Sequence, residues 1–374
     1  MSRLQELREV REIPWVRAAG LYVAVRGIVL GVLVLAARVA DRGVLHVLTG
    51  WDAGWYAGIA DRGYGTVVQH PDGRLLSDYA FFPLFPVTER VLRVAVGSDF
   101  AVAGLVVAVL SSVVAAVGIY RVGELLKGER AGLLLVLLWA VLPIGAVQWM
   151  SYSESLFTAL AAWSLYFVLT ERWVPAGWLC LLAGLTRPTG AALVAAVVVA
   201  AALDLRRSPR HPWQRAQAIA LAPLGLLGYL LFVASRTHDL FGYFAVTRGW
   251  HNGIDLGAAF LDRLGEMLAA RSPWPGLAVV AGVIALGALV RWAHRDGLPL
   301  PLLVYSLVIV VLAFVTSGYF GSKPRYLLPA FPLLLPIAGW LAGRRMAWQA
   351  GIAAATLAVA AAYGAVWLLG SGPP

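Results

Sequence analysis

Long apolar runs separated by short polar segments dominate the sequence. Most of these runs approach the roughly 20 residues that an α-helix needs to cross a bilayer. The pattern predicts an all-α polytopic membrane protein with about 11 transmembrane helices in a single domain, residues 18–370. The runs are 18–40, 101–120, 131–148, 154–170, 174–186, 189–204, 217–235, 276–293, 299–317, 326–342 and 347–369.

Three polar or mixed segments stand out from this pattern. Residues 1–17 place apolar side chains at helical spacing among Arg and Glu, which predicts an interfacial amphipathic helix. Residues 41–99 and 236–275 are too long for simple connectors, so we expect two large functional loops. Within the first loop, AFFPLFP (Ala80–Pro86) is apolar but contains two prolines, which favours an interfacial or re-entrant segment over a span.

Composition supports membrane residence and excludes a water-soluble body. Hydrophobic residues make up 60% of the chain and charged residues only 13%, whereas soluble domains have roughly 25% charged residues. The net charge of +10 needs no nucleic-acid partner, because basic residues gather in the cytoplasmic loops of membrane proteins. Lys127 and Lys323 are the only lysines, and an arginine-rich chain with this Ala, Gly and Val content is typical of a GC-rich bacterial genome. We therefore expect a bacterial plasma-membrane protein.

The basic residues also predict an orientation. They concentrate in alternate loops, at residues 121–130, 206–215, 291–295 and 344–345, and placing these loops in the cytoplasm puts the N-terminus inside and the C-terminus outside. The outer segments are then 41–99, 149–153, 186–189, 236–275 and 318–325. These segments hold nearly every unusual polar cluster, so the sequence predicts a single extracytoplasmic site.

The stretch GWDAGWYAGIADRGY (Gly50–Tyr64) in the first outer loop surrounds one early acid, Asp52, with aromatic residues. We expect a short helix over 53–61, ended by Gly63. Asp52 could cap this helix by accepting from the amides of Gly54 or Trp55, or it could be a general base. The aromatic density favours the second interpretation, because Trp and Tyr rings suit the apolar faces of sugars.

Further charged residues in the outer segments also have two interpretations each. Glu154 could favour the dipole of its helix or face a cavity at the membrane edge. Arg187 lies between two short apolar runs, where an arginine is costly unless it is paired or faces a cavity. Lys323 and Arg325 could bind a phosphate or lipid headgroups. His251 could bind an acceptor or transfer a proton, although a lone loop histidine is usually unremarkable.

Several chemistries lack their motifs. The sequence contains no Walker A, GxGxxG or GxSxG pattern, which argues against soluble nucleotide-dependent chemistry. It contains no HExxH or CxxC, so a dedicated metal site is not supported. We expect no cofactor, although a divalent metal is left open. The single cysteine, Cys180, excludes an intrachain disulfide.

Several of these motifs together resemble a known family. WDAGWYAGIADRGY followed by AFFPLFP is similar to the signature of the PIG-V family of mannosyltransferases, in the GT-C superfamily. YSESLF (Tyr152–Phe157), LTRPTG (Leu185–Gly190) and SKPRYLLPAFPLLLP (Ser322–Pro336) follow in the family's order. The resemblance implies a GT-C-like fold, a polyprenyl-phosphate-mannose donor used outside the cytoplasm, and a lipid, glycan or protein acceptor.

The resemblance also implies roles for residues. Asp52 would deprotonate the acceptor hydroxyl, and inversion would follow from a single displacement of polyprenyl phosphate. The residues expected to bind the donor phosphate are Arg325, Lys323 and Arg187. The residues expected to bind sugar or acceptor are Trp51, Trp55, Tyr56, Tyr64, Phe82, Tyr152, Glu154, His251, Asn252 and Tyr326.

Two other functions stay open. The first is another GT-C enzyme, such as a protein O-mannosyltransferase or an arabinosyltransferase. The second is a non-enzymatic lipid or solute transporter. A transporter would place charges along a path at several depths of the membrane. The clustering of charges on one face disfavours it.

Overall fold

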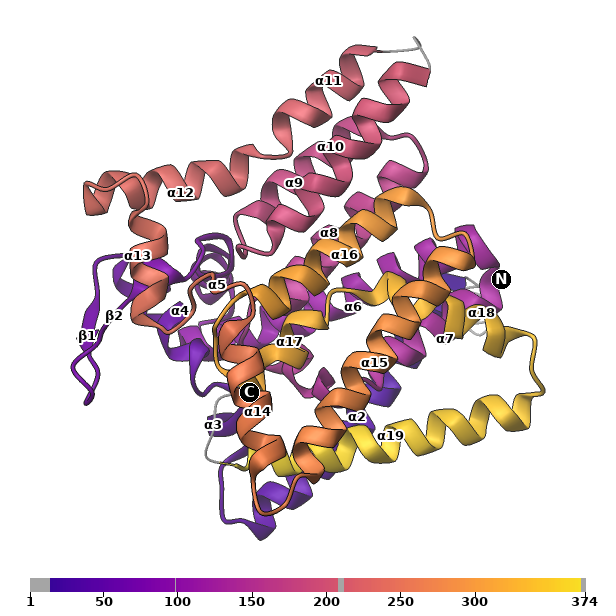
Figure 1. Ribbon diagram of the computed structural model, residues 1–374, viewed down its shortest axis with the longest axis horizontal. Coiled ribbons are helices and arrows are strands. Elements are labelled where there is room, and N and C mark those ends of the chain that lie inside the picture. Colours follow the sequence, from indigo (N-terminus) through magenta and orange to yellow (C-terminus); the bar gives the residue numbers. More distant parts are fainter. Residues whose placement is uncertain (1–13, 98, 208–211, 371–374) are drawn as a thin grey trace.

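The computed structural model describes residues 14–97, 99–207 and 212–370, so most of the interfacial helix predicted over 1–17 lies outside the described residues. Helices form most of this part of the chain (Figure 1). The longer ones are α2 (Pro14–Val39), α5 (Leu84–Val96), α6 (Phe100–Lys127), α7 (Glu129–Ala140), α8 (Glu154–Leu169), α9 (Trp173–Gly184), α10 (Gly190–Arg207), α11 (Pro212–Leu221), α12 (Leu224–Thr237), α14 (Ala258–Ala269), α15 (Trp274–Arg295), α16 (Leu300–Val315) and α19 (Met346–Leu368).

Shorter helices occupy the polar segments and the bends. The α-helices are α3 (Val44–Leu48), α4 (Asp52–Arg62), α13 (Gly242–Gly249), α17 (Lys323–Leu327) and α18 (Leu335–Ala342). The 3-10 helices are η1 (Asp78–Ala80), η2 (Pro143–Trp149), η3 (Phe320–Ser322) and η4 (Phe331–Leu334). The segment Ala80–Pro86 does not form a span. It begins at the last residue of η1 and continues into the first turn of the amphipathic helix α5.

Every apolar run predicted from the sequence is helical, but two of them are sharply bent. The run 131–148 is split into α7 and η2, which meet at 87°, and the segments 320–327 and 331–342 meet at 72°. In the described residues, 5 helices are long and apolar enough to cross a membrane, or up to 7 if each bent pair is one span. The predicted number of about 11 is not confirmed, because apolar helices such as α8, α9 and α16 are shorter.

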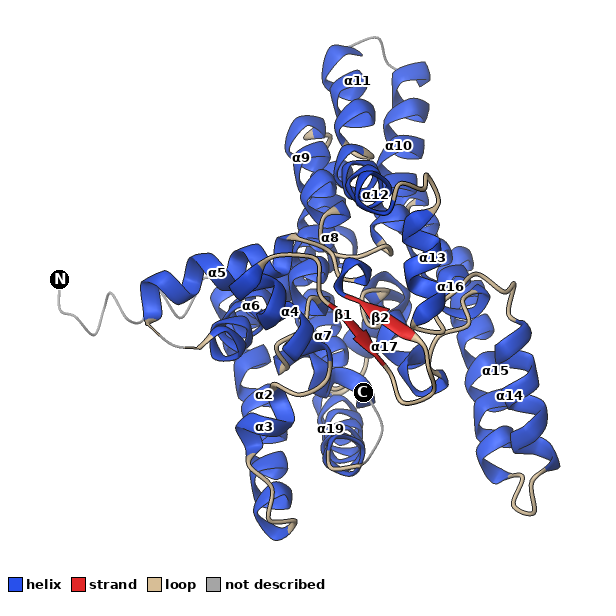
Figure 2. Cartoon of the chain, turned by 90° about the vertical axis from the view of Figure 1, so that its left-hand side faces the viewer, coloured by secondary structure: helices blue, strands red, loops and turns tan. Residues whose placement is uncertain are grey.

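One β-hairpin departs from the all-α expectation. Strands β1 (Val67–Gln69) and β2 (Leu75–Ser77) pair antiparallel, with Val68 opposite Leu76. Figure 2 shows these as the red strands beside the helical body. The hairpin lies within the large loop predicted over 41–99, so the loop is ordered by its own hydrogen bonds.

The bend between α7 and η2 leaves backbone carbonyls without helical partners inside the protein. The side chain of Gln148 donates to the carbonyl of Trp139 at 3.0 Å, and Arg26 donates to that of Ala140 at 3.4 Å. Tyr22 in turn donates to Gln148 at 2.9 Å. Such irregular backbone is tolerated at membrane depth only where protein groups satisfy it.

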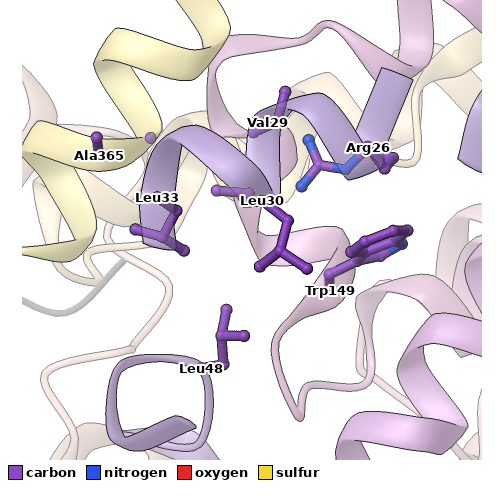
Figure 3. A pocket seen from close by; sticks show the side chains of 9 residues that line it. Arg26, Val29, Leu30, Leu33, Leu48, Trp149 and Ala365 are labelled. Atoms are coloured by element: carbon purple, nitrogen blue, oxygen red, sulfur yellow. The ribbon is translucent and has the colours of Figure 1, made fainter. Parts of the chain in front are cut away.

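Arg26 is almost completely buried in α2 and also lies against Trp149, with its guanidinium carbon 5.7 Å from the ring centroid. The two side chains border a small cavity of about 10 Å³ that is otherwise lined by apolar residues (Figure 3). Helix α2 thus stabilises the bend between α7 and η2. This fixes where the chain continues into the polar segment 150–154.

The predicted cytoplasmic loops are joined at one end of the bundle. Lys127 lies 3.1 Å from Asp296, and Arg130 donates to the carbonyl of Arg344 at 3.3 Å. Helix α6 ends at Lys127 and begins at Phe100, beside α4. Since its 28 residues extend roughly 42 Å, this cluster and the α4 region lie at opposite ends of a long helix.

Candidate active site

Asp52 is the first residue of α4, and its carboxylate reaches across the fold. The N-cap position belongs to Trp51, whose side chain makes no cap hydrogen bond. Arg325 donates from Nη2 to Oδ2 of Asp52 at 2.9 Å. The capping interpretation of Asp52 is therefore wrong, and the expected helix over 53–61 is confirmed as α4, which ends at Gly63 with φ of 82°.

The backbone just before α4 is strained. Trp51 has φ of 56° and ψ of −117°, a conformation that side chains with a Cβ rarely adopt. Strain of this kind costs on the order of 1–3 kcal/mol and persists only where the surroundings impose it. Here the turn directs Asp52 toward Arg325 and leaves the Trp51 ring 52% exposed.

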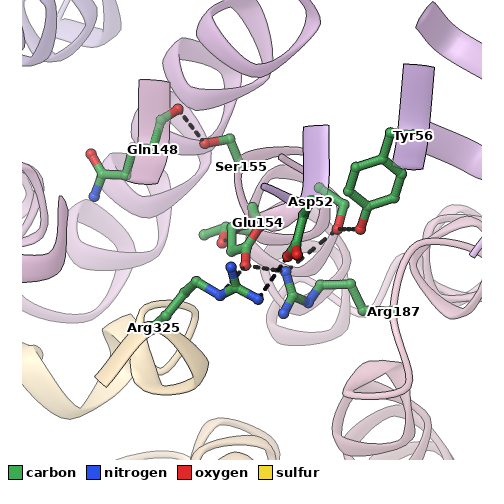
Figure 4. A network of polar contacts seen from close by, with 9 residues as sticks. Asp52, Tyr56, Gln148, Glu154, Ser155, Arg187 and Arg325 are labelled. Atoms are coloured by element: carbon green, nitrogen blue, oxygen red, sulfur yellow. Dashed lines mark hydrogen bonds and ion pairs between the residues drawn. The ribbon is translucent and has the colours of Figure 1, made fainter. Parts of the chain in front are cut away.

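Glu154 and Arg187 complete a cluster of four charged side chains (Figure 4). Glu154 begins α8 and is buried; its Oε1 lies 3.0 Å from Nε of Arg325 and also pairs with Nη1 of Arg187. Arg187 comes from the tight turn between α9 and α10, and its side chain is 11% exposed. Two carboxylates and two guanidiniums offset one another, which permits their burial.

Ser153 links this cluster to α4, and it was missed by the sequence analysis although it stands beside Glu154 in the YSES motif. The hydroxyl groups of Ser153 and Tyr56 are hydrogen-bonded at 2.8 Å, and Arg187 donates to Ser153 at 3.4 Å. Tyr152 lies under Arg325, with the guanidinium carbon 5.1 Å from its ring centroid. Segment 152–154 thus contacts both arginines.

Lys323 does not join the cluster. Its amino group donates to the backbone carbonyl of Thr316. Because successive residues of an α-helix are about 100° apart, two residues separated by two positions project to opposite sides. Lys323 and Arg325 both lie in α17 and therefore diverge. Tyr326 is closer to the site, with its ring centroid 5.8 Å from the guanidinium carbon of Arg325.

Aromatic residues from the two large loops predicted over 41–99 and 236–275 meet beside α4. Trp55 stacks on Phe81 at 5.8 Å between ring centroids and contacts Trp250 edge-on at 4.9 Å. The Trp250 indole donates to the carbonyl of Ser77 at 3.0 Å, which attaches the β-hairpin. Phe81 and Trp250 are not among the predicted ligands, although each stands directly beside a residue that is.

Two of the other predicted aromatic ligands, Phe82 and Tyr64, lie outside the charged cluster. Phe82 is 1% exposed and packs on Tyr229, with ring centroids 4.3 Å apart. Tyr64 donates to the carbonyl of Phe81 at 2.8 Å and stacks on Tyr79. Phe82 is therefore a core residue in this fold rather than a side chain that could contact a sugar.

His251 and Asn252 form backbone hydrogen bonds, one of which links the large loop predicted over 236–275 to Gly318. The carbonyl of His251 accepts from the amide of Gly318 at 2.8 Å, and Asn252 donates through its amide to the carbonyl of Thr247. His251 is exposed, and it is the preceding Trp250 that reaches Trp55. Within residues 14–97, 99–207 and 212–370, no three His, Cys, Asp or Glu side chains form a group that could hold a metal.

Comparison with known proteins gives a class for this fold. The family described as dolichyl-phosphate-mannose-protein mannosyltransferase matches residues 89–232, which is less than half of the chain. ArnT from Cupriavidus metallidurans bound to undecaprenyl phosphate superposes with a TM-score of 0.55 at 17% identity, over 89% of this chain and 62% of ArnT. Apo ArnT gives 0.52 at 18% identity, over 87% and 62%.

A third solved structure is similar at a lower level. The archaeal oligosaccharyltransferase AglB from Archaeoglobus fulgidus, in complex with an inhibitory peptide and a dolichol-phosphate, gives a TM-score of 0.49 at 12% identity, over 92% of this chain and 56% of AglB. No curated protein sequence matches the chain. The predicted GT-C-like fold is confirmed by the similarity to ArnT, and the chain spans 62% of the length of ArnT.

Proposed function

We propose that this protein is a membrane glycosyltransferase that moves a sugar from a polyprenyl-phosphate donor to a hydroxyl acceptor. The observation that carries the proposal is the convergence of Asp52, Glu154, Arg187 and Arg325 from four distant segments. The fold it shares with ArnT, whose structure holds undecaprenyl phosphate, supports a lipid-phosphate donor. Two guanidiniums beside an acid suit a reaction in which a phosphate leaves as a hydroxyl is deprotonated.

The reaction is a single displacement. Asp52 takes the proton of the acceptor hydroxyl, and the resulting oxygen forms a bond to the anomeric carbon of the donor sugar. The bond between that carbon and the phosphate oxygen breaks, and polyprenyl phosphate leaves with the electron pair. Attack opposite the leaving group inverts the anomeric configuration.

Arg325 connects the base with the leaving group. Its guanidinium is shared between Asp52 and Glu154. A donor phosphate adds a third anionic partner, and the planar guanidinium can bind phosphate oxygens through two parallel N–H groups. Arg187, held by Glu154, adds a second positive charge. We assign donor-phosphate binding to these two arginines, with Lys323 outside their contact network.

Mannose is the proposed sugar. The PIG-V-like motifs support this choice, as does the match of residues 89–232 to the dolichyl-phosphate-mannose-dependent family. The acceptor is a lipid, glycan or protein hydroxyl that approaches beside Trp55 and Trp250. The reaction takes place on the outer face of a bacterial plasma membrane, as the distribution of basic loops predicts.

The test is transfer from defined donors. Membranes containing the protein are incubated with radiolabelled polyprenyl-phosphate-mannose, and the labelled product is identified. Membranes containing Asp52→Asn serve as the control. Transfer from polyprenyl-phosphate-arabinose instead would change the sugar but keep the reaction. Absence of transfer from every lipid-phosphate sugar would favour the transporter.

A further inference from the structure

Glu89 is a buried acid outside the charged cluster. It lies in α5, which is not among the candidate membrane spans, and its side chain is fully buried. Ser151 donates from Oγ to Oε1 of Glu89 at 3.2 Å. Among the described residues, Oε2 has no hydrogen-bond partner. Burial raises the pKa of Glu89 to about 9, so the carboxyl group is protonated near neutral pH.

Helix α6 packs closely against Glu89 and Ser151 at Gly104. A Cβ atom on Gly104 would lie 2.0 Å from Oε1 of Glu89 and 2.1 Å from Oγ of Ser151. Any larger residue would force the two polar groups apart or displace the helix. The backbone of α6 therefore covers the hydrogen bond and excludes other partners from it.

Glu89 and Ser151 are connected to the charged cluster through the backbone of residues 151–154. Ser151 precedes Tyr152, Ser153 and Glu154, which contact the two arginines. The amide of Ser151 donates to the carbonyl of Leu48 at 3.0 Å, which attaches the same segment just ahead of the turn into α4. The position of Ser151 thus controls how segment 152–154 presents its side chains.

Helix α5 also holds α4. Arg90, the residue after Glu89, donates to the carbonyls of Ala60 and Asp61 at 2.6 and 2.8 Å, near the C-terminal end of α4. Neighbouring residues of α5 therefore bind the helix that carries Asp52 and the segment that carries Glu154. One short helix fixes the two acids of the site relative to each other.

We propose that Glu89 is a positioning residue whose buried carboxyl group, through its hydrogen bond with Ser151, sets segment 152–154 against Arg187 and Arg325. The proposal rests on the glycosyltransferase function only for its kinetic consequence. Its structural part concerns the order of segment 150–157 and can be measured without any substrate.

The first measurement is hydrogen–deuterium exchange of the peptide covering 148–157 in purified full-length protein. Glu89→Ala and Ser151→Ala should accelerate exchange of this peptide, whereas Glu89→Gln, which keeps the shape and a hydrogen-bonding oxygen, should leave it close to that of the native protein. Gly104→Ala should accelerate it as well. Gly27→Ala is the matched control, because a Cβ there meets nothing within 4 Å.

The second measurement is transfer kinetics with polyprenyl-phosphate-mannose. Misplacement by about 1 Å can lower a rate by about 100-fold, so Glu89→Ala should lower kcat by about 10- to 100-fold with a smaller change in donor KM. Glu89→Gln should restore most of kcat. If Glu89→Ala does not fold, Ser151→Ala carries the same comparison, since it removes the hydrogen bond and keeps the carboxyl group.

The outcomes separate the two proposals. Native exchange and native kcat in both Glu89→Ala and Ser151→Ala would overturn the positioning role. Equal losses in Glu89→Ala and Glu89→Gln would also overturn it, because a hydrogen bond from Ser151 is available in the second variant. Altered exchange in these variants, with no transfer by the native protein from any lipid-phosphate sugar, would support the positioning role and reject the transferase function.

Discussion

Arg325 and Asp52 are separated by 273 residues along the chain and form an ion pair of 2.9 Å. The contact joins the beginning of α4 to α17, and Glu154 contacts the same guanidinium from α8. The catalytic carboxylate that we propose is thus oriented by a distant arginine rather than by amides of its own helix. Each of the following predictions depends on this arrangement or on the residues that support it.

Replacing Asp52 by Asn should lower transfer by about 10²–10⁴-fold, the usual contribution of a general base. The fold should persist, because Asn is isosteric and the position is part-exposed. Turnover is measured with labelled donor, and folding by size-exclusion chromatography and thermal unfolding. Asp61→Asn is the control, since that exposed acid pairs only with the adjacent Arg62 among the charged groups described. Full activity of Asp52→Asn would contradict the assignment of the base.

Replacing Arg325 by Ala should mainly weaken donor use, with kcat/KM for the donor falling by about 10²–10³-fold. Arg325→Lys should recover only part of this loss, because a single ammonium cannot replace Nη2, which contacts Asp52, and Nε, which contacts Glu154, at the same time. Steady-state kinetics at varied donor concentration give the result. Unchanged donor KM with an unchanged rate in Arg325→Ala would exclude the phosphate role.

Removal of Glu154 should destabilise the protein more than any other change in the cluster. Glu154→Ala leaves Arg187 and Arg325 buried without their shared acid, and breaking a buried ion pair in this way costs about 3–5 kcal/mol. Thermal unfolding in detergent measures the loss. The exposed pair of Glu266 with Arg263 provides the comparison, and Glu266→Ala should change stability by less than about 0.5 kcal/mol. Equal effects would show that the cluster is not buried.

The buried carboxyl group of Glu89 should make stability depend on pH. Its pKa rises from an ordinary value of 4.5 to about 9 in the folded protein, because burial disfavours the charged form. Between these values the folded state keeps a proton that the unfolded state releases, so stability falls as pH rises through this window. The slope from this group reaches about 1.4 kcal/mol per pH unit.

Glu89→Gln removes this titration. Unfolding temperatures of both proteins at pH 5.5, 7.0 and 8.5 test the prediction, and the difference between native and variant should shift in favour of the variant as pH rises. A constant difference across the series would show that the group does not titrate in this window.

The sequence was most informative about which segments come together at the site. Asp52, Glu154, Arg187 and Arg325 come from segments that the basic-loop pattern grouped together or from their immediate boundaries, and the structure brings all four into contact. Every apolar run that hydropathy located is also helical, because twenty apolar residues have few alternatives to a helix in a bilayer. The bends could not be predicted, since they depend on side chains such as Arg26 and Gln148 that satisfy the freed carbonyls.

The side to which a side chain projects from its segment was the second property that the sequence could not predict. Lys323 and Arg325 were expected to act together, but the helix α17 directs them apart. Trp250 contacts Trp55 from the second large loop, and no spacing along the chain indicates a contact over that separation. The buried position of Glu89 could not be predicted either, because its carboxyl group becomes buried only when α5 packs on α6.

Arg26 has a consequence for how the protein is made. An arginine near the middle of a span disfavours membrane insertion by about 2.5–3.5 kcal/mol, and α2 is the first long helix of the described chain. Its partner carbonyl, that of Ala140, is synthesised 114 residues later. During biogenesis, Arg26 in α2 therefore lacks this hydrogen bond until α7 has been synthesised. Stable assembly of the first apolar run therefore depends on the third.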